Sequence, residues 1–451
     1  MISGLIRVLH KYRLLNWAVG RAEKKPKANF RLSRLDGQDK RRAWPRFDWK
    51  SLFSGFRAEP SWPRAVGPAD ALIMGTVVAL IAFGVVMVYS SSAVYAYQKF
   101  KDGQHFLIRQ AIFAAIALPL IILFARLDYH RLRPFTRWFL IGSLALVFLT
   151  VTPLGRTFGG AARWLDLGIV SVQPSEIAKL ALICWLAFSL SKKAERIKSF
   201  SIGFLPHILV TALMMALYLW QPDFGSAVIV GMLTFILLFT AGAKLRYILG
   251  SLALVSPIAY WLITASEYRK LRILAFLFPF KYRYGAGYQI SESLMGYGSG
   301  GLTGVGIGDS RQKLFFLPEA HTDFIGSIIG EELGFIGLAL LILAFVMLIY
   351  RGIRAAVRAP DDYGTYLAVG ITLLIGMQAL TNLAVSVGLL PTKGLVLPFI
   401  SYGGSALLMD SVAVGILLNV SRERARAERL AKPVSANSWS GRRLRIQGGE
   451  I

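Results

Sequence analysis

Ten apolar segments, most of them close to the length of a membrane-spanning helix, dominate this sequence. A helix needs about 20 apolar residues to cross the hydrocarbon of a bilayer. Hydrophobic residues make up 55% of the chain and charged residues only 17%, whereas soluble domains carry about 25% charged residues. We therefore expect an all-α integral membrane protein, a bundle of about ten transmembrane helices. The segments are 70–91, 106–125, 138–153, 172–190, 205–220, 225–242, 247–265, 323–350, 364–390 and 395–419.

The distribution of Lys and Arg predicts how this bundle is oriented. With the N-terminus in the cytoplasm, 37 of these residues fall in inner segments and 13 in outer ones, and such an excess marks the cytoplasmic side. Both termini are then cytoplasmic, and a large outer loop, 266–322, joins the seventh and eighth helices. The net charge of +26 is also typical of nucleic-acid binding, but its distribution over the loops favours membrane topology, and we expect no nucleic-acid partner.

Composition divides the chain into three parts. Residues 1–68 hold 16 Lys and Arg residues and no segment long enough to span a bilayer. They predict a basic cytoplasmic extension, either an amphipathic helix on anionic lipid or a solvated tail. Residues 69–420 form the predicted membrane domain, and residues 421–451 form a basic cytoplasmic tail.

Asp323 is the residue that most strongly indicates a functional site. It stands where the basic outer loop meets the eighth apolar segment, and ionisable residues at membrane depth usually mark functional sites. A simpler alternative is that Asp323 caps the N-terminus of this helix. At 100° per residue, Gly326, Gly330 and Gly334 project onto the same helix face below it. This face predicts either close helix packing or a groove for a lipid tail.

Other polar residues lie at the outer ends of the predicted helices. Glu176 and Lys179 share one helix face and form either a structural ion pair or part of a substrate cleft, in which Lys179 binds phosphate. Asp223 is expected to cap the sixth helix. The outer loop holds seven Lys and Arg residues, which indicates either an anionic ligand or ordinary surface charge. Glycines at 296–308 could expose backbone amides to phosphate, and Pro and Gly at 391–405 interrupt an apolar helix, as in transporter binding sites.

Several motifs in this chain resemble the SEDS family (shape, elongation, division and sporulation). They follow one another in order across residues 68–420, and the Pro-Glu-Ala-His form is more similar to the division branch than to the elongation branch. The motifs are Arg163-Trp164, Gln173–Lys179, Gln221–Asp223, Pro318–Ile325, Gly330–Gly334 and Pro391–Ser405.

The resemblance implies a peptidoglycan glycosyltransferase of the bacterial inner membrane, facing outward and acting at the division septum. It would polymerise lipid II, with Asp323 as general base for the acceptor hydroxyl and undecaprenyl pyrophosphate as leaving group. The candidate substrate-binding residues are Arg163, Glu176, Lys179, Arg311, Lys313, His321, Lys393 and Ser401.

The same resemblance implies the partners of the chain. These are lipid II, a class B penicillin-binding transpeptidase, other divisome membrane proteins and membrane lipids. A divalent cation, Mg²⁺ or Mn²⁺, could accompany the pyrophosphate, although no metal-ligand spacing in the sequence requires one, and no organic cofactor is expected. Two alternative functions stay open, a lipid II flippase and a non-catalytic scaffold for the transpeptidase.

Overall fold

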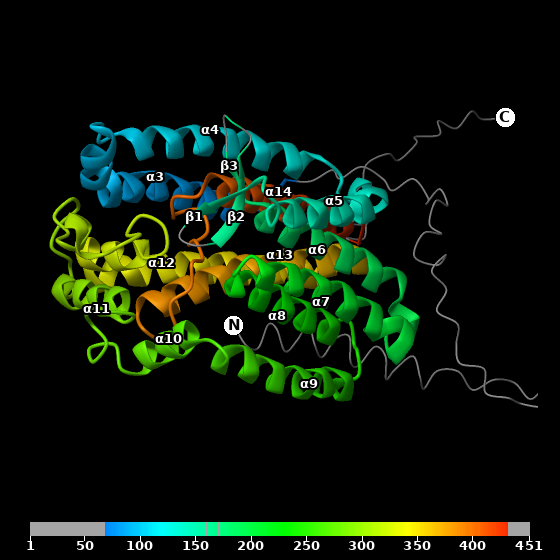
Figure 1. Ribbon diagram of the computed structural model, residues 1–451. Coiled ribbons are helices and arrows are strands. Elements are labelled where there is room, and N and C mark those ends of the chain that lie inside the picture. Colours follow the sequence, from blue (N-terminus) through cyan, green and yellow to red (C-terminus); the bar gives the residue numbers. More distant parts are fainter. Residues whose placement is uncertain (1–67, 159–160, 167, 169–170, 432–451) are drawn as a thin grey trace, which may run out of the picture.

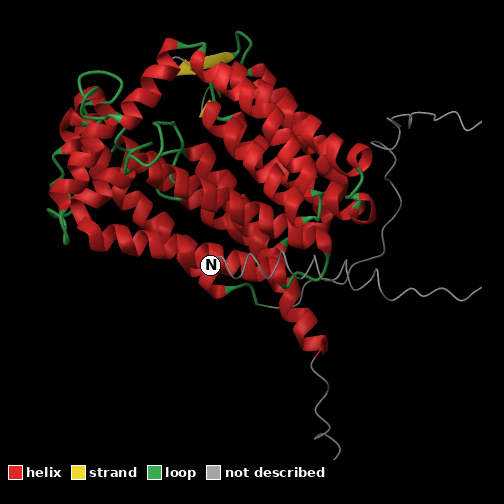
Figure 2. Cartoon of the chain, turned by 90° about the horizontal axis from the view of Figure 1, so that it is seen from below, coloured by secondary structure: helices red, strands yellow, loops and turns green. Residues whose placement is uncertain are grey.

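Helices account for almost all of the described structure (Figures 1 and 2). The computed structural model describes residues 68–158, 161–166, 168 and 171–431. Eight helices among these residues are long and apolar enough to cross a membrane. They are α3 (Ala71–Phe100), α4 (His105–Arg126), η1 (Tyr129–Phe135) continued by α5 (Thr136–Leu149), α6 (Pro174–Lys192), η3 (Phe200–Phe204) continued by α7 (Leu205–Trp220), α12 (Ile325–Val357), α13 (Asp362–Ser386) and α14 (Gly404–Ala431).

Two shorter apolar helices, α8 (Phe224–Thr240) and α9 (Leu245–Thr264), lie where the sixth and seventh spans were predicted. The predicted outer loop, 266–322, folds into α10 (Glu267–Leu277), α11 (Tyr288–Gly300) and the short turn η4 (Gln312–Phe316). Another short turn, η2 (Ala194–Arg196), follows α6. The strands β1 (Gly155–Phe158), β2 (Ala161–Asp166) and β3 (Ser171–Val172) form one small antiparallel sheet in the order β1-β2-β3. Apart from residue 68, the predicted extension 1–68 lies outside the described residues, as does the tail beyond residue 431.

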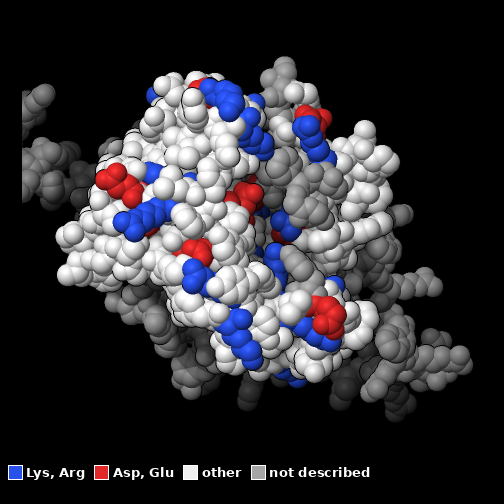
Figure 3. Space-filling model, turned by 60° about the vertical axis from the view of Figure 1, so that its left-hand side comes forward, with Lys and Arg blue, Asp and Glu red and all other residues white. Residues whose placement is uncertain are grey.

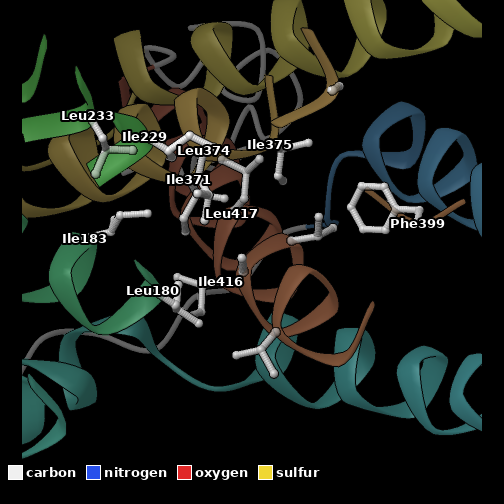
Figure 4. Close-up of a cluster of buried hydrophobic side chains, with 14 of the residues drawn as sticks. Leu180, Ile183, Ile229, Leu233, Ile371, Leu374, Ile375, Phe399, Ile416 and Leu417 are labelled. Atoms are coloured by element: carbon white, nitrogen blue, oxygen red, sulfur yellow. The ribbon is translucent and has the colours of Figure 1, made fainter. Parts of the chain in front are cut away.

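Helices α6, α13 and α14 form the centre of the bundle. Their sequences are apolar on most sides, as expected for helices surrounded by other helices, whereas α4, α5 and α9 expose apolar side chains that match the apolarity of lipid tails. Figure 4 shows part of this core, with side chains from four helices facing one another. The labelled members are Leu180 and Ile183 of α6, Ile229 and Leu233 of α8, Ile371, Leu374 and Ile375 of α13, Ile416 and Leu417 of α14, and Phe399, which precedes α14.

Helix α12 is broken at Gly334, which the sequence did not predict. Gly334 has φ 65° and ψ −164°, a conformation that favours glycine because other residues carry a Cβ atom. The break frees two carbonyl groups and two amides of the helix, and loop residues 301–306 pair with all four. The replacement bonds run from Val305 N–H to the Glu331 carbonyl, from Gly306 N–H to the Glu332 carbonyl, from Phe335 N–H to the Gly301 carbonyl and from Ile336 N–H to the Leu302 carbonyl.

The tenth apolar segment begins as an irregular stretch, residues 391–403, so the helix predicted from residue 395 starts only at Gly404. Pro391, Pro398 and the glycines explain the difference, because proline removes a backbone donor and disfavours a continuous helix. Helix α3 supports the stretch at close range, since a Cβ atom on Gly84 would lie 2.5 Å from the Phe399 carbonyl oxygen. Non-helical backbone at membrane depth is tolerated where protein surrounds it.

Candidate active site

Asp323 lies in the turn that leads into α12, and neighbouring elements hold the backbone of this turn. Asn382 of the buried helix α13 donates to the Asp323 carbonyl at 2.9 Å and to the Leu395 carbonyl at 2.6 Å. Ser401 donates to the Thr322 carbonyl at 2.6 Å. The turn and the irregular stretch 391–403 are therefore fixed to each other and to the core of the bundle.

The Asp323 carboxylate is free to act as a base. The alternative that it caps α12 was wrong, because the residue before the helix is Phe324 and no side chain caps this end. The side chain is half-buried, and within the described ranges no group donates a hydrogen bond to its carboxylate. Burial is the largest cause that raises the pKa of Asp323 from 3.8 to about 7, and the Glu319 carboxylate raises it further. A base with a pKa near neutrality is well matched to proton transfer.

Two cationic side chains from separate elements act on this acid. The guanidinium of Arg163, in β2, donates to the Pro222 carbonyl, and Arg272, in α10, donates to the Thr392 carbonyl at 3.2 Å. Both arginines oppose the rise in the pKa of Asp323. Lys393 lies in the stretch 391–403. Figure 3 shows charged side chains of both signs on the face at the left-hand side of Figure 1, some of them around a hollow near its centre.

Two further residues complete the surroundings of the acid. Lys393 lies with its Nζ 4.6 Å from the centre of the Phe224 ring, and burial lowers its pKa. Asp223 caps α8, as predicted, by accepting from Ser226 N–H at 3.2 Å. Its charge also acts on both Lys393 and Asp323. The arrangement is an accessible carboxylate flanked by cations, which suits a reaction in which a hydroxyl loses a proton and an anion leaves.

Lys179 and Lys313, both predicted to bind phosphate, are instead engaged inside the protein. Lys179 is fully buried and pairs with Glu176 at 2.7 Å, the alternative that the spacing also allowed. Lys313 pairs with the buried carboxylate of Glu332 at 3.1 Å. A buried carboxylate is costly without its cation, so neither lysine is available to a substrate in this structure.

Ser401, His321 and Arg311 have different surroundings. Ser401 is buried, donates to the Thr322 carbonyl and accepts from Leu397 N–H at 2.9 Å. Its hydroxyl therefore connects two backbone segments and is not available to a substrate in this structure. His321 packs against aromatic rings, with Phe106 at 4.8 Å between ring centres, and burial lowers its pKa. Arg311 is exposed at its side chain and stays a candidate for binding an anion.

The glycine face of α12 is packed rather than open, so the predicted lipid-tail groove was wrong. Gly326, Gly330 and Gly334 are all buried. A Cβ atom on Gly330 would collide with the ring of Tyr297 in α11, and one on Gly326 would lie 3.1 Å from the Tyr297 hydroxyl. The glycines admit α11 and its following loop at close range. The amides of Val305 and Gly306 are likewise used by α12 and cannot cradle phosphate.

Sequence reasoning missed Arg272, Asn382 and Glu319 as parts of this site. The only signal for Arg272 was the unusual basicity of the outer loop, which could not single out one of its seven cations. Over the described ranges, no group of three His, Cys, Asp or Glu side chains could hold a metal ion. A divalent cation at the site would therefore have to draw most of its ligands from water and substrate phosphate.

A known protein family matches most of this chain. The family model that covers FtsW, RodA and SpoVE, described as "Cell cycle protein", matches residues 70–426. The chain therefore belongs to the FtsW/RodA/SpoVE family.

Individual relatives match over almost their full length. A protein of Geobacter metallireducens named "Probable peptidoglycan glycosyltransferase FtsW" is 48% identical over 353 residues, covering 78% of this chain and 94% of the relative. The "Stage V sporulation protein E" of Bacillus subtilis is 41% identical over 356 residues, covering 78% of this chain and 96% of the relative.

Solved structures show the same architecture. A chain from a peptidoglycan synthase complex that coordinates polymerization and crosslinking matches with a TM-score of 0.66 and 29% identity, covering 79% of this chain and 98% of that chain. The rod shape determining protein RodA of Thermus thermophilus matches with a TM-score of 0.58 and 27% identity, covering 79% of this chain and 97% of that chain.

Proposed function

We propose that this chain is a peptidoglycan glycosyltransferase that polymerises lipid II into glycan strands, with Asp323 as the general base. The observation that carries the proposal is the accessible Asp323 carboxylate, whose pKa is raised to about 7 and whose turn is tied to the buried helix α13. The names of the relatives supply the reaction class. The proposal joins that reaction to a half-buried carboxylate on which Arg163 and Arg272 act.

The reaction joins a sugar hydroxyl to the anomeric carbon of a second, lipid-linked sugar. The acceptor hydroxyl loses its proton to Asp323 as its oxygen bonds to the anomeric carbon, and the bond from that carbon to the pyrophosphate breaks. A positioned base contributes roughly 10²–10⁴-fold to such a step. Arg163, Arg272 and Lys393 would compensate the charge on the departing undecaprenyl pyrophosphate.

The proposal places the hollow on the outer side of the inner membrane. It includes ten crossings, formed by the eight long helices and by α8 and α9, with both termini in the cytoplasm. The excess of Lys and Arg in the inner segments supports this orientation. A class B penicillin-binding transpeptidase and other divisome proteins are the proposed partners, at the septum. The first is supported by the similarity to a chain from a synthase complex that polymerises and crosslinks.

A divalent cation, Mg²⁺ or Mn²⁺, is a further part of the proposal. Glu319, whose charge acts on Asp323, is the carboxylate that would hold such an ion, and Mg²⁺ accepts few protein ligands when phosphate and water supply the others. Chelation with EDTA followed by addition of Mg²⁺ or Mn²⁺ tests this part, and polymerisation that is unchanged by EDTA would remove it from the proposal.

A lipid II flippase is the alternative with a different activity. It would need polar groups through the depth of the membrane, but the buried charges Glu176, Lys179 and Asp410 are enclosed in the centre of the bundle. This enclosure favours the polymerase. A scaffold would not need a free carboxylate among cations.

The three functions are separated by one reconstitution. The purified chain, with its transpeptidase partner, receives fluorescent lipid II in liposomes, and polymerisation and lipid scrambling are measured side by side. Asp323→Asn is expected to lower polymerisation by about 100-fold or more while the transpeptidase still co-purifies. Polymerisation by this variant at the wild-type rate would overturn the assignment of the base, and scrambling without polymerisation by the wild-type chain would overturn the reaction.

A further inference from the structure

A group of charged and polar side chains is enclosed in the centre of the bundle and takes no part in the proposed reaction. Its members are Glu176 and Lys179 of α6, Gln378 of α13 and Asp410 of α14, each at most 5% exposed. Lys179 Nζ lies 2.8 Å from Glu176 Oε1 and 2.7 Å from Glu176 Oε2. Gln378 Nε2 donates to Glu176 Oε2 at 3.4 Å. The ammonium of Lys179 is thus bound to both carboxylate oxygens of Glu176.

A hydrogen bond between the starts of α6 and α14 places Asp410 at the depth of this pair. Gln173 N–H, directly before α6, donates to Ser405 Oγ in the first turn of α14 at 3.1 Å. As the fourth and tenth predicted spans, both helices run inward from this contact. At 1.5 Å per residue, Glu176 and Lys179 lie about 4.5 and 9 Å below it, and Asp410 lies about 7.5 Å below it. The charges of Glu176 and Lys179 accordingly act on Asp410.

The group lacks both a positive charge and a partner for two of its oxygen atoms. Asp410 Oδ2 and Gln378 Oε1 are buried without a hydrogen-bond partner, and no ion pair in the described part of the chain reaches Asp410. Buried acceptors without a partner are costly. Two ionised carboxylates and one lysine also give the group a net charge of −1, and an uncompensated buried charge is costly as well.

We propose that this group binds one Na⁺ ion, with Asp410 Oδ2 and Gln378 Oε1 among its ligands. Hard cations take carboxylate and amide oxygens as ligands. Over the described ranges, no third His, Cys, Asp or Glu side chain completes a metal site, which suits a monovalent ion rather than a divalent one. A proton on one oxygen of Asp410 would leave the other without a donor, because no described group donates to this carboxylate.

The proposed ion would join the three central helices below the candidate active site. Its ligands come from α13 and α14, and Gln378 also contacts Glu176 of α6. Gln378 and Asn382 are one turn apart on α13, and Asn382 donates to the Asp323 carbonyl. The ion would therefore stabilise the part of the core on which the turn of Asp323 is anchored. This role does not depend on the reaction that the chain catalyses.

Thermal unfolding of the purified full chain tests the site. The melting temperature is measured at constant ionic strength while NaCl replaces choline chloride, whose cation is too large for a buried site. We expect the melting temperature to rise with the Na⁺ concentration, because a ligand that binds only the folded state stabilises it by mass action. At 100 times its dissociation constant, Na⁺ should favour the folded state about 100-fold. Equilibrium dialysis with radioactive Na⁺ should show saturable binding.

Substitutions of the two proposed ligands make the test specific. Asp410→Asn removes the charge with little change in shape and should abolish the effect of Na⁺. In choline chloride it should melt at or above the wild-type temperature, because no carboxylate is then left uncompensated. Gln378→Met keeps Asp410 and should move the rise in melting temperature to higher Na⁺ concentrations. Glu195→Gln is the matched control, because it removes an exposed carboxylate of η2 and should keep the wild-type response to Na⁺.

Three results would overturn the inference. The first is a wild-type melting temperature that Na⁺ leaves unchanged. The second is a response to Na⁺ that persists in Asp410→Asn. The third is a melting temperature in choline chloride that depends on pH in the wild type and not in Asp410→Asn, without binding of Na⁺, because a proton would then occupy the site. None of these results bears on the proposed function, which Asp323→Asn tests separately.

Discussion

The pH dependence of polymerisation is the sharpest consequence of the environment of Asp323. Only the deprotonated form can accept a proton, so activity should fall as the pH falls. With a pKa of about 7, Asp323 is about half deprotonated at pH 7 and about one-hundredth deprotonated at pH 5, a loss of roughly 50-fold. An ordinary aspartate with a pKa of about 3.9 would lose only about one-tenth of its activity over the same range.

Removal of a neighbouring charge should shift this profile in a known direction. Burial is the largest cause of the raised pKa of Asp323, and Glu319 is the next. Glu319→Gln should therefore lower the pKa of Asp323 and move the fall in activity to lower pH. Glu267→Gln is the matched control, since Glu267 is 82% exposed at its side chain and pairs with Lys270.

The assay is the initial rate of fluorescent lipid II polymerisation at saturating substrate between about pH 5 and pH 8, with thermal unfolding measured at each pH. Protonation of Asp323 does not unfold the chain at low pH, so unfolding driven by this residue cannot explain a fall in activity there. The pKa of Asp323 is higher in the folded chain than in the unfolded one, so its protonation at low pH favours the folded state. A rate that stays flat down to pH 5, or a profile that Glu319→Gln leaves in place, would refute the reasoning.

Two further substitutions test the packing around the site by thermal unfolding. Lys313→Met leaves the buried Glu332 carboxylate without its cation and should lower the free energy of unfolding by about 3–5 kcal/mol. The control Lys270→Met removes an exposed pair and should lower it by at most about 0.5 kcal/mol. Equal effects of the two substitutions would contradict the buried pair. Gly330→Ala drives a methyl group into the Tyr297 ring and should cost about 1–3 kcal/mol, and an unchanged melting temperature would instead indicate an open groove.

The sequence was sufficient to predict the helical membrane fold and the position of Asp323 at the end of a helix. Apolar segments of spanning length are local features, and so is an acid at their boundary. The sequence also allowed the Glu176–Lys179 pair, because its partners are three residues apart. A projection at 100° per residue assumes an unbroken helix, however, and it could not reveal that Gly334 interrupts α12.

Contacts between residues far apart in the sequence explain why the role predicted for Lys313 was wrong and why Arg272 was missed. Lys313 and Glu332 are 19 residues apart and meet only because the loop folds back onto α12. Arg272 and Thr392 are 120 residues apart. A lysine in a basic loop looks the same in the sequence whether it faces a substrate or a buried carboxylate. The partner decides its role, and the partner is set by tertiary structure.

The acid and the cations of the site are held by different elements. Asp323 precedes the short segment of α12 above Gly334, and Asn382 connects its backbone to the buried helix α13. Arg163 and Arg272 are carried by the small sheet and by α10, and Lys393 by the irregular stretch 391–403. The acid is thus anchored in the core together with the stretch that carries Lys393, while Arg163 and Arg272 lie on the small sheet and on α10. Under the proposed function, Asp323 would act from a position that the core holds in place, and general-base catalysis needs the base at a fixed distance from the reacting hydroxyl.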